Sequence, residues 1–156
     1  MLNKVEFQFQ SPRDSPGFLL SQLSTLWHRK QKKILDPLDL THTQFVLMAT
    51  LAWLSKSSEQ VTQIDIAGES NTDRMMVSKV LRTLENKGFI TRVPHKSDTR
   101  AKVVRLTSSG TKVVQKALEK VESSDIAFFE YLKADLKRFN GNLWKLIAKN
   151  QDEFKL

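Results

Sequence analysis

Residues 73–88 read DRMMVSKVLRTLENKG, and this stretch decides the fold. Its apolar residues recur at i, i+3, i+4 and i+7, which places them on one face of a helix: Val77, Val80, Leu81 and Leu84. Asn71 or Thr72 can cap the start of that helix, and Gly88 suits the left-handed conformation that ends one. The pattern therefore predicts an amphipathic helix over 73–87 with one face in the protein core.

The opposite face of this helix is polar and cationic, and a hairpin with a basic tip follows it. The helix residues expected to face a partner are Arg74, Met75, Met76, Ser78, Lys79 and Arg82. Short strands are predicted at 89–93 and 102–106. The loop between them carries Lys96, Asp98 and Arg100, and it is too long for a tight two-residue turn.

Shorter helices are predicted upstream of this stretch. Apolar residues at helical spacing run from Gly17 to the break at Asp36-Pro37, and residues 1–16 are expected to form a mobile or loosely docked arm. Thr41-His-Thr-Gln has the form of a capping box that starts a second helix, and Thr62 can cap a short third one. The order of elements describes a winged helix-turn-helix, in a mainly α fold with a small β-hairpin wing.

The chain after the hairpin is predicted to be helical and strongly apolar. Thr107 can cap a long helix, and beyond Ser124 aromatic residues continue the helical spacing. Apolar residues keep their phase across Asn140-Gly141, so one helix carrying a glycine is favoured over two. Such an apolar extension needs a surface to pack against, and a symmetric second copy of the chain offers one. The alternative is that the extension packs into the core of its own chain.

Positive charge is concentrated around the predicted amphipathic helix and hairpin. The chain has a formal net charge of +8, of which residues 72–105 contribute +6, whereas residues 1–71 are neutral. A merely solvated surface does not predict this concentration, and a nucleic-acid partner does. Arg can read guanine, Ser several base edges and Met a thymine methyl, whereas Lys79 and Arg82 could equally contact phosphates.

Composition argues against several other classes of function. The absence of Cys excludes disulfides, thiolate metal sites, iron–sulfur clusters and a thiol redox sensor. The sequence has no glycine-rich phosphate loop and no nucleophile elbow, and its three His residues lack the spacing of metal ligands. We therefore expect no enzyme activity, no cofactor and no metal. No apolar window is long enough to span a membrane, and the start is unlike a signal peptide, so a cytoplasmic protein is expected.

Two linked motifs resemble those of the MarR family of bacterial regulators. Residues 76–90 resemble its recognition helix and the Leu-Glu-x-x-Gly exit into the wing. Residues 98–110 resemble its wing signature, an Asp and a following Arg, a strand, and then Leu-Thr-x-x-Gly. The resemblance covers roughly residues 17–149. Thr99-Arg100 stands where the family often has two Arg, and Met75-Met76 where small hydroxyl residues are common, which puts base preference in question.

The resemblance implies a homodimeric transcription regulator, usually a repressor, that binds a pseudo-palindromic operator in double-stranded DNA. Residues 41–110 would be the DNA-binding region, and residues 17–37 and 111–156 the dimerisation helices. Arg100 would enter or flank the minor groove, and Asp98 would orient it. A small aromatic or anionic effector could release the DNA.

Two alternatives stay open at this point. Trp27, Trp53 and Trp144 could line an effector cleft, although ordinary packing is favoured. A winged helix can also serve as a protein-interaction adaptor without specific DNA binding, because fold does not fix function. Retention of duplex DNA at modest salt would distinguish the adaptor from the regulator.

Overall fold

The computed structural model describes residues 5–98 and 101–151, and this part of the chain is mainly helical with one two-stranded hairpin. The elements run in the order α1 (Pro16–Leu35), α2 (His42–Leu54), α3 (Gln63–Ser70), α4 (Arg74–Asn86), β1 (Ile90–Pro94), β2 (Lys102–Leu106), α5 (Ser108–Phe129) and α6 (Leu136–Asn150). Short 3-10 turns lie at Pro12–Asp14, Asp36–Leu38 and Glu130–Asp135. The predicted winged helix-turn-helix fold, with helices on both sides of it, is confirmed. None of the described helices is long and apolar enough to cross a membrane.

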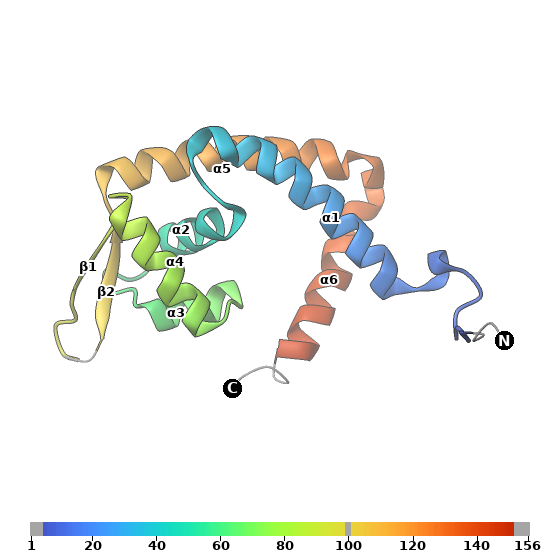
Figure 1. The fold of residues 1–156 in the computed structure, drawn as a ribbon, viewed down its shortest axis with the longest axis horizontal. Helices are drawn as coiled ribbons and strands as arrows, with labels where there is room; N and C mark the ends of the chain where they lie inside the picture. Colours follow the sequence, from blue (N-terminus) through green and yellow to red (C-terminus); the bar gives the residue numbers. More distant parts are fainter. Residues whose placement is uncertain (1–4, 99–100, 152–156) are drawn as a thin grey trace.

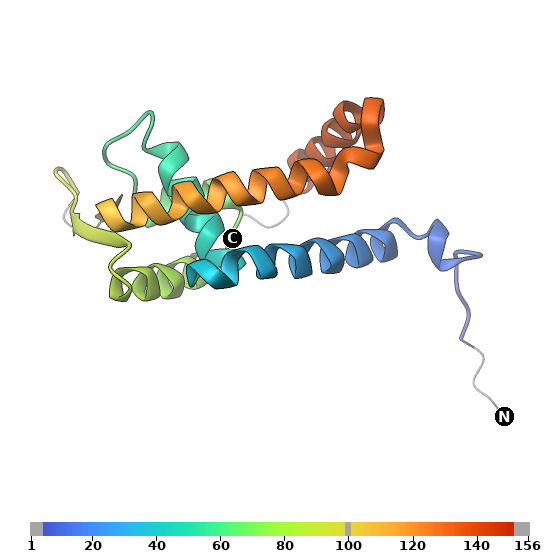
Figure 2. The same ribbon diagram turned by 90° about the horizontal axis from the view of Figure 1, so that it is seen from above.

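Helices α1 and α5 lie side by side and join the two ends of the molecule (Figures 1 and 2). Helices α2–α4 and the hairpin are gathered at one end of α5, and α6 leads away from the other end. Trp27 Nε1 and Gln31 Nε2 of α1 both donate to Oδ1 of Asp125 in α5, at 2.7 and 2.9 Å. Because Gln31 is fully buried, these charge-assisted bonds fix α1 against α5.

The core lies between the winged helix-turn-helix and the first half of α5. Leu47, Met48 and Leu51 of α2 are fully buried in it. The strands pair antiparallel, with Ile90 opposite Leu106 and Pro94 opposite Lys102. The amide of Val104 donates to the carbonyl of Val61 at 2.8 Å, which ties the hairpin to the chain just before α3. The hairpin and the helices are therefore parts of one packed unit.

The capping boxes at the starts of α2 and α3 follow the sequence closely. At α2, Thr41 and Gln44 make both reciprocal bonds of a capping box, as predicted. At α3, Thr62 is the predicted cap, and Asp65 completes a second box by accepting from the Thr62 amide at 2.8 Å. Such boxes satisfy amides that a helix start leaves without partners.

The predicted cap of α4 is wrong. Asp73, rather than Asn71 or Thr72, caps the helix, and its Oδ1 accepts from the amide of Met76 at 3.0 Å. Asn71 instead takes a left-handed conformation, with φ of 49°, and ends α3. Asn tolerates this conformation better than most residues, so the turn between the two helices uses it there.

The prediction of one helix across Asn140-Gly141 is confirmed, but a break that was not predicted lies before that helix. Residues 136–150 do form one helix through Gly141, as predicted, but the chain breaks earlier, between α5 and α6. Lys133 there has φ of 44° and ψ of −118°, which no helix accommodates. The bend sends α6 away from α5 (Figure 1).

Candidate nucleic-acid interface

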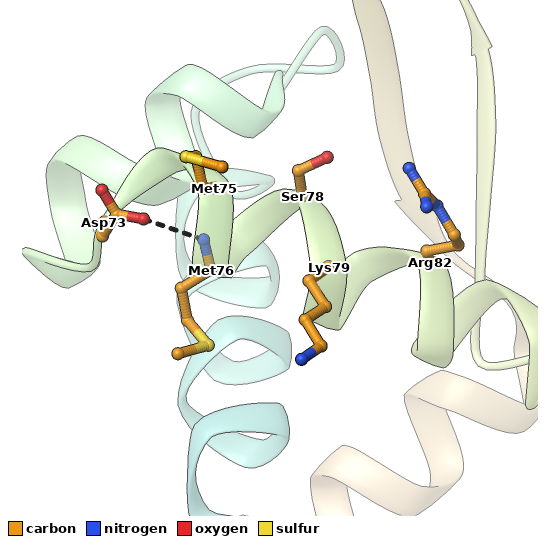
Figure 3. Close-up of a pocket in the computed structure, with 6 residues that line it drawn as sticks. All are labelled: Asp73, Met75, Met76, Ser78, Lys79 and Arg82. Atoms are coloured by element: carbon orange, nitrogen blue, oxygen red, sulfur yellow. Dashed lines mark hydrogen bonds between the residues drawn. The ribbon is translucent and has the colours of Figure 1, made fainter.

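Helix α4 presents a polar and cationic face to solvent. Its inward residues Val77, Leu81 and Leu84 are fully buried, which fixes the rotation of the helix against the core. The outward residues line a hollow in the surface: Asp73, Met75, Met76, Ser78, Lys79 and Arg82. Figure 3 shows that Met75, Ser78 and Arg82 project from one side of the helix, and Met76 and Lys79 from the other. The two rows follow the spacing of i, i+3 and i+7 positions along a helix.

Asp73 is the residue of this hollow that the sequence reasoning missed. Its carboxylate caps α4 and places a negative charge at the start of the helix. Helix starts otherwise attract anions, so this charge makes the Lys79 and Arg82 end the more favourable one for a phosphate. The available signal was the Asp that opens the 73–88 stretch, because Asp is a common capping residue.

In the described part of the wing tip, backbone amides donate to the side chains of His95 and Gln60. The amides of Ser97 and Asp98 both donate to Nδ1 of His95, at 3.3 and 3.2 Å. The amide of Lys96 donates to Oε1 of Gln60 at 3.4 Å, so the tip is also tied to the connector before α3. Lys96 and Asp98 are exposed. Arg100, the predicted minor-groove residue, lies outside the described residues.

Two cations of the basic region are engaged inside the protein rather than available to a partner. Arg92 of β1 forms an ion pair with Glu85 of α4, and its Nε donates to Oε2 of Glu85 at 2.9 Å. Lys87 Nζ lies 3.0 Å from the carboxylate of Asp39 and donates to the Asp39 carbonyl at 2.6 Å. The hydrogen bond from Arg92 lowers the pKa of Glu85, so the stability that this pair adds is lost only as the pH falls through that lowered pKa.

The base of the wing explains the chemistry of the Leu-Thr-x-x-Gly motif. Thr107 caps α5 by accepting from the amide of Gly110 at 2.9 Å, and its hydroxyl donates to the carbonyl of Gly88 at 2.7 Å. Gly88 directly follows the C-cap residue of α4 and takes a left-handed conformation, with φ of 72°. A Cβ at Gly110 would lie 1.9 Å from the carbonyl oxygen of Phe89, so only glycine allows α5 to start this close to the wing.

The three tryptophans differ in their packing. Ordinary packing is confirmed for Trp27, whose ring contacts those of His28 and His42 edge to face. Trp53 of α2 and Trp144 of α6 are instead 60% and 65% exposed in the single chain. Burial and the neighbouring His28 lower the pKa of His42, and Asp125 opposes them. Within the described ranges no group of three or more His, Asp or Glu residues is placed to hold a metal.

The hairpin beside an anchored helix with an exposed cationic face defines a winged helix-turn-helix protein of the transcription-regulator class. Residues 40–102 match the MarR family. Over 122 residues the chain is 47% identical to YdcH of Bacillus subtilis (strain 168), an uncharacterized HTH-type transcriptional regulator, and the match covers 78% of this chain and 83% of YdcH. The chain belongs to the MarR family of transcriptional regulators, and members of this family are not enzymes.

Solved structures of similar fold include proteins bound to DNA and to a small molecule. S. aureus MepR in complex with DNA has a TM-score of 0.79 and 26% identity, covering 89% of this chain and 99% of MepR. CouR from Rhodococcus jostii RHA1, bound to p-coumaroyl-CoA, has a TM-score of 0.76 and 23% identity, covering 90% and 96%. A mutant MarR from E. coli with operator DNA has a TM-score of 0.75 and 22% identity, covering 90% and 99%. CouR and MarR show a shared fold at these identities.

Proposed function

We propose that this chain binds duplex DNA in a sequence-specific manner as a homodimer and acts as a transcriptional repressor in the cytoplasm. The observation that carries the proposal is the division of α4 into a buried apolar face and an exposed face with Arg74, Lys79 and Arg82. The recognition helix of a helix-turn-helix unit needs such a division, because one face packs on the core while the other meets the major groove. MepR, a relative of the same fold, is bound to DNA.

The residues of the α4 face have different roles in this proposal. Arg74 and Ser78 would contact base edges, and Met75 and Met76 would cover thymine methyl groups. Lys79 and Arg82, beyond the negative Asp73, would contact phosphates and position the helix. In the wing, Lys96 would contact the backbone, and Arg100 would reach the minor groove with Asp98 as its orienting carboxylate. Residues 41–110 would be the DNA-binding region.

The dimer would form through the helices outside this region. Within the described part of the chain, α6 buries none of its residues, and even its large apolar side chains are exposed: Trp144 is 65% exposed and Leu146 is 62% exposed. In α1, Leu20 and Leu26 are 60% and 56% exposed. Exposed apolar surface of this extent is typically buried in an interface, and a second copy related by twofold symmetry would bury it. The proposed dimerisation segments are residues 17–37 and 111–156.

Release of the DNA by a small aromatic or anionic effector is a further part of the proposal. Its support is CouR, which has the same fold and is bound to p-coumaroyl-CoA, an aromatic and anionic molecule. The effector would act by favouring a separation of the two α4 helices that no longer matches successive major grooves, which are about 34 Å apart.

Selection of bound fragments from a random duplex library tests DNA binding, symmetry and spacing together. We expect a pseudo-palindrome with half-sites about one helical turn apart. The logarithm of the binding constant should fall with the logarithm of salt concentration, with a slope of roughly one unit per contacted phosphate. A flat salt titration, or no retained duplex at modest salt, would favour the adaptor function over the regulator.

Light scattering tests the dimer, and Trp144→Glu tests its surface. The intact chain should give twice the 17.9 kDa mass of one copy at micromolar concentration. Trp144→Glu should weaken the dimer by about 100-fold or more, because twofold symmetry places each interface residue in the dimer twice. Lys145→Ala, which lowers the charge by the same single unit on the same helix, is the matched control. A mass near one copy for the intact chain would refute the dimer.

A further inference from the structure

The methionines of the described residues differ sharply in exposure. Met48 is fully buried in α2, whereas Met75 is 82% exposed and Met76 is 49% exposed in the first turn of α4. Both exposed thioethers lie in the hollow that also contains Lys79 and Arg82, one on each side of the helix (Figure 3). An oxidant in solution therefore reaches the sulfur atoms of α4 long before it reaches the core.

We propose that Met75 and Met76 form an oxidation site through which hypochlorous acid, a two-electron oxidant, releases this protein from DNA. The inference rests on the proposed DNA binding of α4. The chain has no Cys, so its sulfur chemistry is confined to thioethers. In the reaction hypochlorous acid transfers its oxygen to the sulfur: an S–O bond forms, the O–Cl bond breaks, and chloride and a proton leave. Sulfur loses two electrons and chlorine gains them, so the step balances.

The product has the wrong chemistry for the groove that α4 would enter. A methionine side chain can contact a thymine methyl, but a sulfoxide replaces that apolar end with a strong hydrogen-bond acceptor and no donor. Phosphate oxygens are acceptors too, as are most base-edge groups of the major groove. A sulfoxide covered by DNA would therefore lose its hydration and face mainly other acceptors, which disfavours the complex.

The position of the site adds a second effect on the cations of α4. Lys79 follows Met76 by three residues and projects from the same side of the helix, whereas Met75 projects from the other side (Figure 3). A sulfoxide oxygen on Met76 can therefore accept from the Lys79 ammonium, which would otherwise contact a phosphate. Oxidation thus removes an apolar contact and also diverts a cation, and both changes weaken the same complex.

The reaction is reversible in cells that contain methionine sulfoxide reductases, so this chemistry can act as a switch. Exposure of the site also depends on the bound state. In the proposed complex α4 lies in the groove, and the free protein is the form that an oxidant attacks. Oxidation would then hold free protein away from its operator until the thioethers are restored.

The experiment compares the affinity of the full chain for a selected duplex before and after treatment with hypochlorous acid. Mass spectrometry should find added oxygen on the tryptic peptide of residues 75–79 and none on Met48, which serves as the internal control. Treatment should weaken binding on the order of tenfold for each α4, or about 100-fold for a dimer with two such helices. Methionine sulfoxide reductases should restore the affinity.

The double variant Met75→Leu with Met76→Leu separates this site from other oxidisable groups, because it keeps the exposed Trp53 and Trp144. Whatever its own affinity, its ratio of treated to untreated binding should stay near one. An equal loss in the double variant would overturn the proposal, as would unchanged binding of a chain that carries oxygen on residues 75–79. Failure of the untreated chain to bind any duplex would overturn the proposed function, and the inference with it.

Discussion

Replacing Gly110 with alanine is expected to lower the free energy of unfolding by about 3 kcal/mol or more. The new Cβ would lie 1.9 Å from the carbonyl oxygen of Phe89 and 2.8 Å from its carbonyl carbon. Backbone atoms cannot rotate out of the way as a flexible side chain can, so the first turn of α5 must move from the start of the wing. That movement would also strain the Thr107 cap, which bonds to both Gly88 and Gly110. A loss of this size is a large part of the stability of a typical domain.

Thermal unfolding at one fixed protein concentration measures this effect, since the stability of a dimer depends on concentration. The Gly110→Ala variant should melt about 10 °C lower than the parent. Gly68→Ala is the matched control, because Gly68 lies inside α3 with open space where its Cβ would be. Alanine there should leave stability unchanged or raise it by up to about 1 kcal/mol. Similar losses in both variants would contradict the role given to the Phe89 contact.

Local patterns in the sequence predict much of this fold because their causes are local. The stripe of α4 and the Thr41 and Thr62 caps each depend on residues within a few positions of one another. The Leu-Thr-x-x-Gly motif combines a local requirement with one set by a distant residue. Its Thr is a local cap, but its Gly is required by the backbone of Phe89, about 20 residues earlier in the chain.

The parts of the site that the sequence did not predict depend on distant or competing partners. Lys87 meets Asp39, a residue 48 positions away, and charge counting along the chain cannot detect such a pair. Asp73 and Thr72 are both good caps, and the conformation of Asn71 at the end of α3 decides between them. Lys133 is a good helix former by propensity, so nothing local to it predicts the bend before α6.

Removing Lys79 and Arg82 together is expected to weaken binding to every duplex by a similar factor, on the order of 100-fold at low salt. Neither residue would read a base in the proposed docking, so Lys79→Ala with Arg82→Ala should leave the preferred sequence unchanged. A dimer would lose four phosphate contacts, and the salt slope should fall by about four units. Fluorescence anisotropy of a labelled duplex over a series of salt concentrations measures affinity and slope together.

Arg74→Ala and Ser78→Ala are expected to behave differently, because these side chains would contact base edges. Each should cost about 1–3 kcal/mol of discrimination at its base pair and change the selected sequence. The control pair Lys116→Ala with Lys120→Ala removes as much charge as the Lys79 and Arg82 pair, but from the exposed face of α5. Its salt slope should stay within one unit of the parent. If both pairs lowered affinity and slope equally, net charge rather than the α4 face would account for DNA binding.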